Sequence, residues 1–317
     1  MTKSLLITGA AGFIGFHLAR AAKARGDRVV GVDNFNAYYD PKLKEMRAEV
    51  LAQEGIEVVR GDICDPELLE QIAKTHEVTH ITHLAAQAGV RYSLENPQVY
   101  IKTNVEGFLN ILELCRQRPD TKLVYASSSS VYGLNEKVPF SETDRVDHQA
   151  SLYGATKKSN ELFASTYHHL FDISVTGLRF FTVYGPWGRP DMAYYSFTQK
   201  ILNGEPIKVF NQGKMLRDFT YIDDIVRGTL AAIDRGSACE VFNLGNHRPV
   251  ELKTFIEIIE QAVGKKAKME LLPMQPGDVP ATFADIAHSQ KELGFHPETS
   301  LEEGIPRFVE WYRSLSL

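Results

Sequence analysis

The sequence predicts an α/β protein: a doubly wound parallel sheet followed by a smaller C-terminal α/β lobe. Short apolar runs alternate with amphipathic helical patterns up to residue 181, which is typical of parallel sheets with helices on both faces. A glycine-rich turn joins the first apolar run to the first helical pattern. Beyond Thr182 the segment 185–190, Gly-Pro-Trp-Gly-Arg-Pro, breaks the alternation. We therefore expect a first domain of residues 1–181 and a second lobe of residues 182–317, interleaved with the first near its end.

The composition of the whole chain excludes several classes of protein. It has 317 residues, 44% of them hydrophobic, and a net charge of −5, which favours neither nucleic acid nor an anionic membrane as a partner. Three widely spaced cysteines form neither a disulfide framework nor a zinc pattern, so we expect no metal. No apolar run is long enough for a membrane span, and the N-terminal residues are needed for the first strand. We expect a cytoplasmic protein.

The first 180 residues read as alternating strands and helices. Two of the helices are expected to begin at Asp40-Pro41 and Asp65-Pro66, because proline is well tolerated in the first turn of a helix. The expected strands are residues 5–7, 29–32, 56–60, 78–86, 122–126 and 173–180. The other expected helices are residues 16–23, 97–118 and 151–170.

The second lobe is expected to contain shorter, mixed elements. Its helices are residues 194–203, 223–234, 252–263, 287–293 and 301–314. Its extended segments are residues 207–210, 216–221, 240–244 and 269–272.

The first turn carries the spacing G-x-x-G-x-x-G, from Gly9 through Gly12 to Gly15. Glycines let the backbone approach a pyrophosphate, whose charge then meets the amides and the dipole of the following helix. Asp33 ends the next strand, where a carboxylate accepts from both adenine-ribose hydroxyls and repels a 2′-phosphate, which favours NAD over NADP. The expected contacts within the turn are Gly9, Gly12, Phe13, Ile14 and Gly15.

Three further groups of residues follow predicted strands. Open α/β sheets bind ligands at the carboxyl ends of their strands. Asp62 and Ile63 follow the third strand, so we place them beside the adenine. Leu84, Ala85 and Ala86 end the fourth, where their small size lets a cofactor come close. The run of serines 127–130 follows the fifth strand and is too polar to be core.

Tyr153 and Lys157 are four residues apart on a predicted helix and so share one face. A nearby ammonium lowers the pKa of a phenol, which makes Tyr153 a plausible acid or base at neutral pH. A serine hydroxyl, for which we select Ser128, can hydrogen-bond the same substrate oxygen and relay its proton. We expect Ser128, Tyr153 and Lys157 to be catalytic.

With these motifs the chain resembles the extended short-chain dehydrogenase/reductases, the nucleotide-sugar epimerases and dehydratases. The resemblance covers essentially the whole chain. It implies a Rossmann domain that binds NAD, with further cofactor contacts at Thr103 and Phe181, and a second lobe that binds a nucleoside-diphosphate sugar. It also implies a homodimer formed through helices 97–118 and 151–170. The residues that carry it are Gly9, Gly12, Gly15, Asp33, Ser128, Tyr153, Lys157, Arg217-Asp218-Phe219 and Pro276-Gly277-Asp278.

Within this family, segments 36–40, 87–93, 182–190 and 274–279 are similar to the UDP-glucuronate 4-epimerases. Related dehydratases and decarboxylases carry an acidic residue just before the Val-Tyr-Gly step, where this chain has Ser129 and Ser130. The resemblance implies reversible C4 epimerisation of UDP-glucuronate to UDP-galacturonate through a 4-keto sugar. Tyr153 would then take the C4 hydroxyl proton, and Lys157 would hold the nicotinamide ribose.

The resemblance also implies the substrate contacts. Arg217 would bind the diphosphate and Asp278 a ribose hydroxyl, although Gln275 stands where glucose-type epimerases have arginine. Arg189 and Thr182 would hold the sugar carboxylate, with Ser128 and Ser129 also facing the sugar. Simple surface ion pairs, of Arg189 with Asp191 or of Arg217 with Asp218, are the alternatives. Two other functions stay open: a UDP-glucose or UDP-N-acetylglucosamine 4-epimerase, and a non-catalytic NAD-binding sensor.

Overall fold

The computed structural model describes residues 2–236, 238–274 and 280–315. Its main element is a seven-stranded sheet in the order β11-β6-β5-β4-β1-β2-β3, in which every neighbouring pair is parallel. The predicted doubly wound parallel sheet is therefore confirmed. The strands are β1 (Ser4–Thr8), β2 (Arg28–Asp33), β3 (Glu57–Arg60), β4 (His80–His83), β5 (Lys122–Ser128), β6 (Val175–Phe180) and β11 (Cys239–Leu244).

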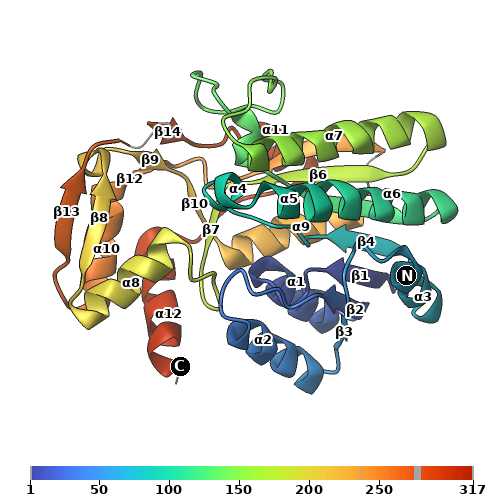
Figure 1. Ribbon diagram of the computed structural model, residues 1–317, viewed down its shortest axis with the longest axis horizontal. Coiled ribbons are helices and arrows are strands. Elements are labelled where there is room, and N and C mark those ends of the chain that lie inside the picture. Colours follow the sequence, from blue (N-terminus) through green and yellow to red (C-terminus); the bar gives the residue numbers. More distant parts are fainter. Residues whose placement is uncertain (1, 237, 275–279, 316–317) are drawn as a thin grey trace.

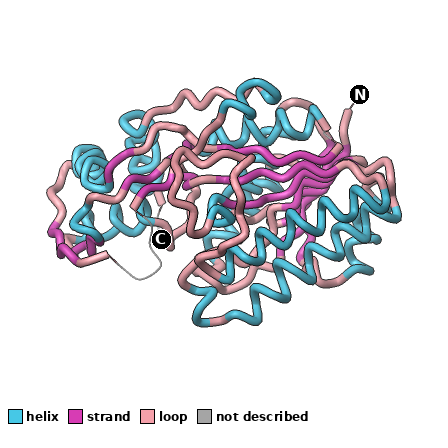
Figure 2. Tube along the Cα trace, turned by 90° about the horizontal axis from the view of Figure 1, so that it is seen from above, coloured by secondary structure: helices cyan, strands magenta, loops and turns pink. Residues whose placement is uncertain are grey.

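Both faces of this sheet are buried under helices, as Figure 2 shows. On β1, Leu5 and Ile7 belong to one apolar cluster, whereas Leu6 between them belongs to a second cluster. Side chains alternate along a strand, so the two clusters lie on opposite faces. Helices α1 (Phe13–Ala24) and α9 (Ile222–Arg235) pack together in the first cluster. The second cluster contains α3 (Pro66–Thr75), α6 (Gly107–Gln117) and α7 (Leu152–Phe171).

Side-chain caps mark the starts of several helices, among them α3 and α7. The Asp65 carboxylate accepts from the Leu68 amide at 3.0 Å and starts α3. Ser151 Oγ accepts from the Gly154 amide at 3.0 Å and starts α7, the helix that carries Tyr153. Each cap satisfies an amide that would otherwise lack a partner in the first turn. Helix α2 (Lys42–Gln53) follows Pro41, as expected from the Asp-Pro pair.

Strand β4 is shorter than the predicted strand 78–86. It ends at His83 because the Thr8 hydroxyl accepts from the amides of Leu84 and Ala85, at 3.2 and 3.1 Å. The chain thereby leaves the sheet at the point where the predicted small-residue segment begins.

The predicted helix 97–118 is also interrupted. It consists of α5 (Pro97–Tyr100), a π-helical segment (Ile101–Glu106) and α6, preceded by the short α4 (Tyr92–Glu95). Within the wide segment, the buried Asn104 amide binds both the N–H and the C=O of Gln87, at 2.8 and 3.0 Å. Such π-helical turns often occur at functional sites. This one connects the helix to the loop that follows β4.

A smaller group of elements lies at the opposite end of the molecule from the N-terminus, on the left of Figure 1. It contains the parallel pair β8 (Pro206–Phe210) and β13 (Lys268–Leu272), with α8 (Ala193–Asn203), α10 (Leu252–Val263) and α12 (Leu301–Ser314). The chain does not stay there, because β11 pairs with β6 of the large sheet and α11 (Ala287–Leu293) packs on β11.

The predicted strand 216–221 is two strands in two different sheets. β9 (Leu216–Arg217) pairs with β12 (Val250–Glu251) and β14 (Ala281–Thr282). β10 (Phe219–Tyr221) pairs with β7 (Thr182–Tyr184). Between them the buried Asp218 carboxylate accepts from the amides of Asn246 and Ala284, at 2.6 and 3.0 Å. Asp218 therefore joins three loops, a role that periodicity does not indicate.

Candidate active site

A pocket of about 450 Å³ opens at the carboxyl ends of the central strands. This is the edge at which open α/β sheets bind ligands. Most of the residues predicted for the cofactor, the chemistry and the sugar line it. They are Gly9, Gly12, Phe13, Ile14, Gly15, Asp33, Ile63, Leu84, Ala85, Ala86, Thr103, Ser128, Ser129, Tyr153, Lys157, Phe181, Thr182 and Arg189.

Two of the predicted site residues, Asp62 and Arg217, are not among the residues that line this pocket. The Asp62 carboxylate instead accepts from Asn34 Nδ2 and the Cys64 amide, at 3.0 and 2.9 Å. Arg217 donates to the carbonyls of Leu216 and Pro280, at 2.9 and 3.4 Å. Asp278 and the neighbouring Gln275 lie outside the described residues.

The glycine turn is too tight for other residues. Gly9 has φ +71°, and a Cβ there would stand 2.8 Å from the Ala85 amide nitrogen. A Cβ on Gly15 would stand 2.2 Å from the Gly9 carbonyl oxygen. Side chains at these positions would clash with the backbone of the turn and of the segment after β4, so only glycine lets the chain turn this tightly and present its amides at the start of α1. The turn fits a dinucleotide.

The carboxylate of Asp33 stands beside this turn and is fixed in place. Its Oδ2 accepts from the Ala11 amide at 3.1 Å, and its Oδ1 accepts from the Phe35 amide at 2.9 Å. Asp33 is buried in the protein yet borders the pocket. Because each carboxylate oxygen has a second lone pair, Asp33 can still accept from ribose hydroxyls.

His83 directly precedes the segment 84–86 that lines the pocket, and its imidazole is neutral. Its Nδ1 lies 2.8 Å from the Thr8 hydroxyl, which already accepts two backbone amides and so donates its own proton to the imidazole. Complete burial lowers the pKa of His83 to about 3. The histidine is therefore hydrogen-bonded and uncharged.

Tyr153, Lys157 and Ser128 meet at one end of the pocket. Lys157 Nζ donates to the Ala126 carbonyl at 2.9 Å, and burial lowers the pKa of Lys157 to about 8. Burial also raises the pKa of the Tyr153 phenol, while its hydrogen bond with Ser128 and the Arg189 charge act in the opposite direction. The prediction that a nearby ammonium lowers this pKa is thus wrong for the net shift, because burial disfavours the phenolate more strongly.

The serine run is less exposed than predicted. Ser127 is 2% exposed and Ser128 is 9% exposed, so these two residues are buried although the sequence places the run outside the core. Ser127 can be buried because its hydroxyl donates to Glu161 Oε1 at 2.7 Å. Glu161 stands on α7, four residues after Lys157.

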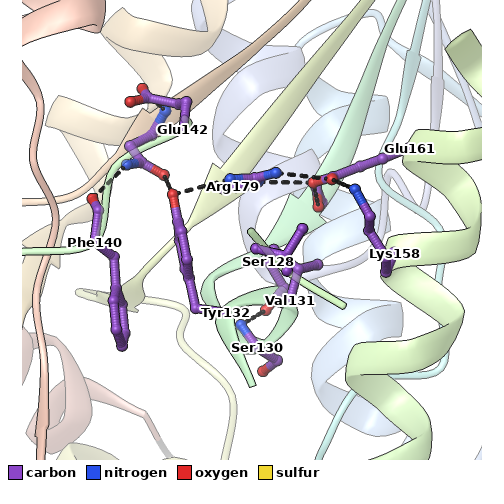
Figure 3. A network of polar contacts seen from close by, with 12 residues as sticks. Ser128, Ser130, Val131, Tyr132, Phe140, Glu142, Lys158, Glu161 and Arg179 are labelled. Atoms are coloured by element: carbon purple, nitrogen blue, oxygen red, sulfur yellow. Dashed lines mark hydrogen bonds and ion pairs between the residues drawn. The ribbon is translucent and has the colours of Figure 1, made fainter. Parts of the chain in front are cut away.

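A buried ion pair stands behind the serines. Figure 3 shows the guanidinium of Arg179 between the Glu161 carboxylate and the Tyr132 phenol. Arg179 donates from Nε and Nη2 to Glu161, at 2.8 and 2.9 Å, and from Nη1 to the Tyr132 hydroxyl at 3.0 Å. The sequence analysis missed both residues of this pair. The signals were present: Glu161 continues the Tyr153–Lys157 face by one turn, and Arg179 interrupts an apolar strand.

Arg189 occupies another part of the pocket wall. Its Nε and Nη2 donate to Asp191, at 3.0 and 2.6 Å, and its guanidinium lies 5.8 Å from the centroid of the Tyr38 ring. Tyr38 in turn donates to Asp191 Oδ2 at 3.2 Å. The ion pair named as an alternative is therefore present, and Arg189 also borders the pocket and acts electrostatically on Tyr153.

Comparison with protein families identifies the group to which the chain belongs. Residues 5–245 match the NAD-dependent epimerase/dehydratase family. The chain belongs to this family.

Relatives in the epimerase/dehydratase family are similar over nearly the whole length. UDP-glucuronate 4-epimerase 4 of Arabidopsis thaliana is 54% identical over an alignment 329 residues long. The alignment covers 98% of this chain and 75% of the plant protein. Among solved structures, UDP-glucuronic acid 4-epimerase of Bacillus cereus, in complex with UDP-glucuronic acid and NAD, matches with a TM-score of 0.90. It is 35% identical, and the match covers 98% of this chain and 99% of that one.

The UDP-glucose 4-epimerase of Thermotoga maritima, solved with UDP-glucose, matches with a TM-score of 0.88. It is 33% identical, with 98% of each chain covered. In the described part of this family member, no cluster of histidine, cysteine or acidic residues could hold a metal ion. Nor does any helix among those residues have the length and apolar character to cross a membrane.

Proposed function

We propose that this protein is an NAD-dependent UDP-glucuronate 4-epimerase, an isomerase that interconverts UDP-glucuronate and UDP-galacturonate. One observation carries the proposal: Arg189, a cation suited to a carboxylate, borders the same pocket as Ser128, Tyr153 and Lys157. The 54% identity to a plant UDP-glucuronate 4-epimerase supports the choice of sugar. We infer that residues 1–181 hold NAD and that residues 182–317 bind the nucleotide sugar.

The residues around the glycine turn fit NAD. The N-terminus of α1 and the close backbone of Gly9 and Gly12 would hold the pyrophosphate. Asp33 would accept from the adenine-ribose hydroxyls, and its charge would reject a 2′-phosphate. Bound NAD supplies the oxidant for C4 of the sugar and returns the same reducing equivalent at the end of each turnover.

The chain itself moves the proton. Tyr153, hydrogen-bonded to Ser128, takes the C4 hydroxyl proton during oxidation and returns it after the 4-keto sugar has turned over. Ser128 also holds the same oxygen. Lys157, fixed to the Ala126 carbonyl, holds the ribose beside the phenol and stabilises a phenolate electrostatically.

The 4-keto intermediate makes the carboxylate a hazard. Once C4 is a ketone, the C6 carboxylate is β to it, and such acids lose carbon dioxide when the C5–C6 bond stands perpendicular to the carbonyl plane. Arg189 can hold the carboxylate away from that geometry through parallel, charge-assisted hydrogen bonds, with the Thr182 hydroxyl as a further donor. The site has Ser129 and Ser130 where related lyases have an acidic residue.

One experiment distinguishes this proposal from a UDP-glucose 4-epimerase, the function of the similar Thermotoga maritima protein. Purified protein is incubated separately with UDP-glucuronate, UDP-glucose and UDP-xylose, and the products are identified by NMR. We expect UDP-galacturonate from the first sugar and much slower conversion of the others. Equal turnover of UDP-glucose would favour the glucose-type enzyme, and no turnover of any sugar would favour a non-catalytic NAD-binding protein.

We also propose a cytoplasmic homodimer. Apolar side chains are exposed along the predicted dimer helices: Ile101 and Leu109 on the 97–118 segment, and Leu162 and Leu170 on α7. Exposed apolar patches of this kind mark interaction sites. Light scattering of the wild type and of Leu162→Asp tests the dimer, because a charge at that interface should yield monomers. Three free cysteines suit a reducing compartment.

A further inference from the structure

The backbone carbonyls of residues 186–188, just before Arg189, are bound by two side chains from residues 1–181, the part of the chain proposed to hold NAD. His17 Nε2 lies 2.9 Å from the Pro186 oxygen, and because a carbonyl only accepts, His17 is the donor. Arg47 Nη2 donates to the oxygens of Trp187 and Gly188, at 2.5 and 3.1 Å. His17 belongs to α1 and Arg47 to α2. We call this pair the carbonyl clamp.

Arg47 is an unusual residue for such a contact. It is completely buried, its hydrogen bonds go to carbonyls and a phenol rather than to a carboxylate, and its Nε has no partner among the described residues. Burying a cation among neutral groups is unfavourable. The position is therefore poor as a simple stabilising device, which points to a role in setting geometry.

The backbone that Arg47 holds is itself strained. Trp187 has φ +60°, a left-handed conformation that is rare for a bulky residue. Such a conformation persists only where the surroundings enforce it. Here Arg47 binds the Trp187 carbonyl, and the indole packs against Phe16 and Trp311, with ring centroids 5.2 and 5.5 Å apart. Arg189 follows two residues later.

Arg47 also reaches the cofactor site. Its Nη1 donates to the Ala11 carbonyl at 2.9 Å. The backbone amide of Ala11 in turn donates to the Asp33 carboxylate. A continuous chain of hydrogen bonds therefore runs from the Asp33 carboxylate through Ala11 and Arg47 to the Gly188 carbonyl. This chain of hydrogen bonds connects the glycine turn to the backbone beside Arg189.

We propose that His17 and Arg47 are positioning residues that fix Arg189 relative to the bound cofactor, and so determine both selectivity for a uronate and retention of its carboxyl group. This inference rests on the proposed function. A misplacement of about 1 Å at a reacting centre can lower a rate about 100-fold. Arg189 holds the carboxylate of UDP-glucuronate, so the position of that carboxylate depends on the carbonyl clamp. UDP-glucose has no carboxylate for Arg189 to hold.

The side reaction that the clamp prevents can be written in full. C4 gives a hydride to NAD and its hydroxyl proton to Tyr153. The C5–C6 bond then breaks and releases carbon dioxide, and the electron pair left on C5 takes up a proton. One NADH and one UDP-4-keto-pentose form for each carbon dioxide, so the three products can be counted against one another.

The test uses Arg47→Lys, Arg47→Met and His17→Leu, with Arg20→Ala as the matched control. Arg20 also stands on α1, and its guanidinium pairs with Glu54 just beyond α2 in an exposed ion pair, so it binds Glu54 and not the three loop carbonyls. For each protein, kcat and KM are measured with UDP-glucuronate and with UDP-glucose, together with carbon dioxide and NADH. Thermal unfolding monitors the fold, and His17→Leu or Arg47→Lys carries the test if Arg47→Met does not fold.

We expect kcat/KM for UDP-glucuronate to fall about 10- to 100-fold in the clamp variants. The value for UDP-glucose should change far less, and carbon dioxide and NADH should rise together. Arg20→Ala should resemble the wild type. Equal losses with both sugars would show a merely structural role and overturn the inference while leaving the proposed function intact. A wild type inactive on UDP-glucuronate would overturn both.

Discussion

Lys157 Nζ donates a hydrogen bond to the Ala126 carbonyl oxygen at 2.9 Å, which ties helix α7 to the end of strand β5. Ala126 stands two residues before Ser128, and Lys157 one turn after Tyr153. This bond therefore contributes to the spacing between the phenol and the serine hydroxyl, together with the bond from Ser127 to Glu161. Because Lys157 is buried and its pKa falls to about 8, the ammonium is largely retained at neutral pH while its proton lies close to the reacting groups.

Tyr153→Phe should lower turnover of UDP-glucuronate by about two to four orders of magnitude, the range of a positioned acid or base. The substitution removes the hydroxyl but keeps the ring packing, so NAD should stay bound. Ser128→Ala should lower turnover less, because water can partly replace its hydroxyl. Tyr167→Phe is the control: it stands on the same helix, and its hydroxyl donates to Glu113 away from the pocket. Near-normal turnover in Tyr153→Phe would assign the base to another group.

Arg189→Ala should slow epimerisation of UDP-glucuronate and divert part of the turnover to decarboxylation, because the carboxylate is no longer held out of the reactive geometry. Arg189→Lys should behave similarly, since a lysine cannot form the two parallel hydrogen bonds. Carbon dioxide and NADH absorbance are followed together. Unchanged kinetics in both variants would leave Arg189 as a partner of Asp191 alone.

Asp33→Ala should yield protein that is purified with little NAD, because the ribose hydroxyls lose their acceptor and the Ala11 amide loses its partner. Dinucleotide released by denaturation is measured by absorbance and compared with the wild type. Asp65→Ala serves as the control, because it removes only the cap of α3. Loss of such a cap lowers the free energy of unfolding by about 1 kcal/mol. Full NAD content in Asp33→Ala would place the adenosine ribose elsewhere.

Glu161→Gln should reduce the free energy of unfolding by about 3–5 kcal/mol, because it leaves Arg179 as a buried cation without a counter-charge. The two side chains are 3% and 4% exposed. In contrast, Arg116→Gln removes an exposed ion pair with Glu113 and should cost less than about 1 kcal/mol. Urea unfolding at pH 7 measures both. Similar decreases in the free energy of unfolding in the two variants would show that the buried ion pair contributes no more to stability than the exposed one.

Acid should destabilise the protein partly through His83. Its pKa is about 3 in the folded protein and 6.5 as the unfolded reference, so its contribution is complete above about pH 6.5 and is lost as the pH falls toward 3. Between pH 7 and pH 5 this amounts to about 2 kcal/mol. His83→Asn keeps an acceptor for the Thr8 hydroxyl but does not titrate, so it should lose about that much less stability over the same interval. Parallel pH profiles, from urea unfolding, would exclude this role.

Patterns in the sequence are enough to predict the order of the strands along the chain, the glycine turn and, together with the family resemblance, most of the pocket residues. Strands, caps and turns are local features: a strand is recognised by its apolar run, a cap by Asp65, and a turn by glycines at fixed spacing. Because parallel strands bring their carboxyl ends to one edge, residues as distant in sequence as Asp33 and Ser128 can be assigned to one site from the order of strands and helices, whereas Thr182 and Arg189 are assigned only through the family resemblance.

The protonation states and long-range contacts of the site residues depend on the tertiary structure. Burial, which depends on the whole fold, raises the pKa of Tyr153, although the spacing of Tyr153 and Lys157 in the sequence predicts a lowered pKa. Asp218 divides one predicted strand into two because it accepts amides from loops that meet only after folding. Arg47 contacts carbonyls as far as 141 positions away. Contacts of this kind leave no periodic signal, because they depend on the distance between atoms in space and not on their spacing along the chain.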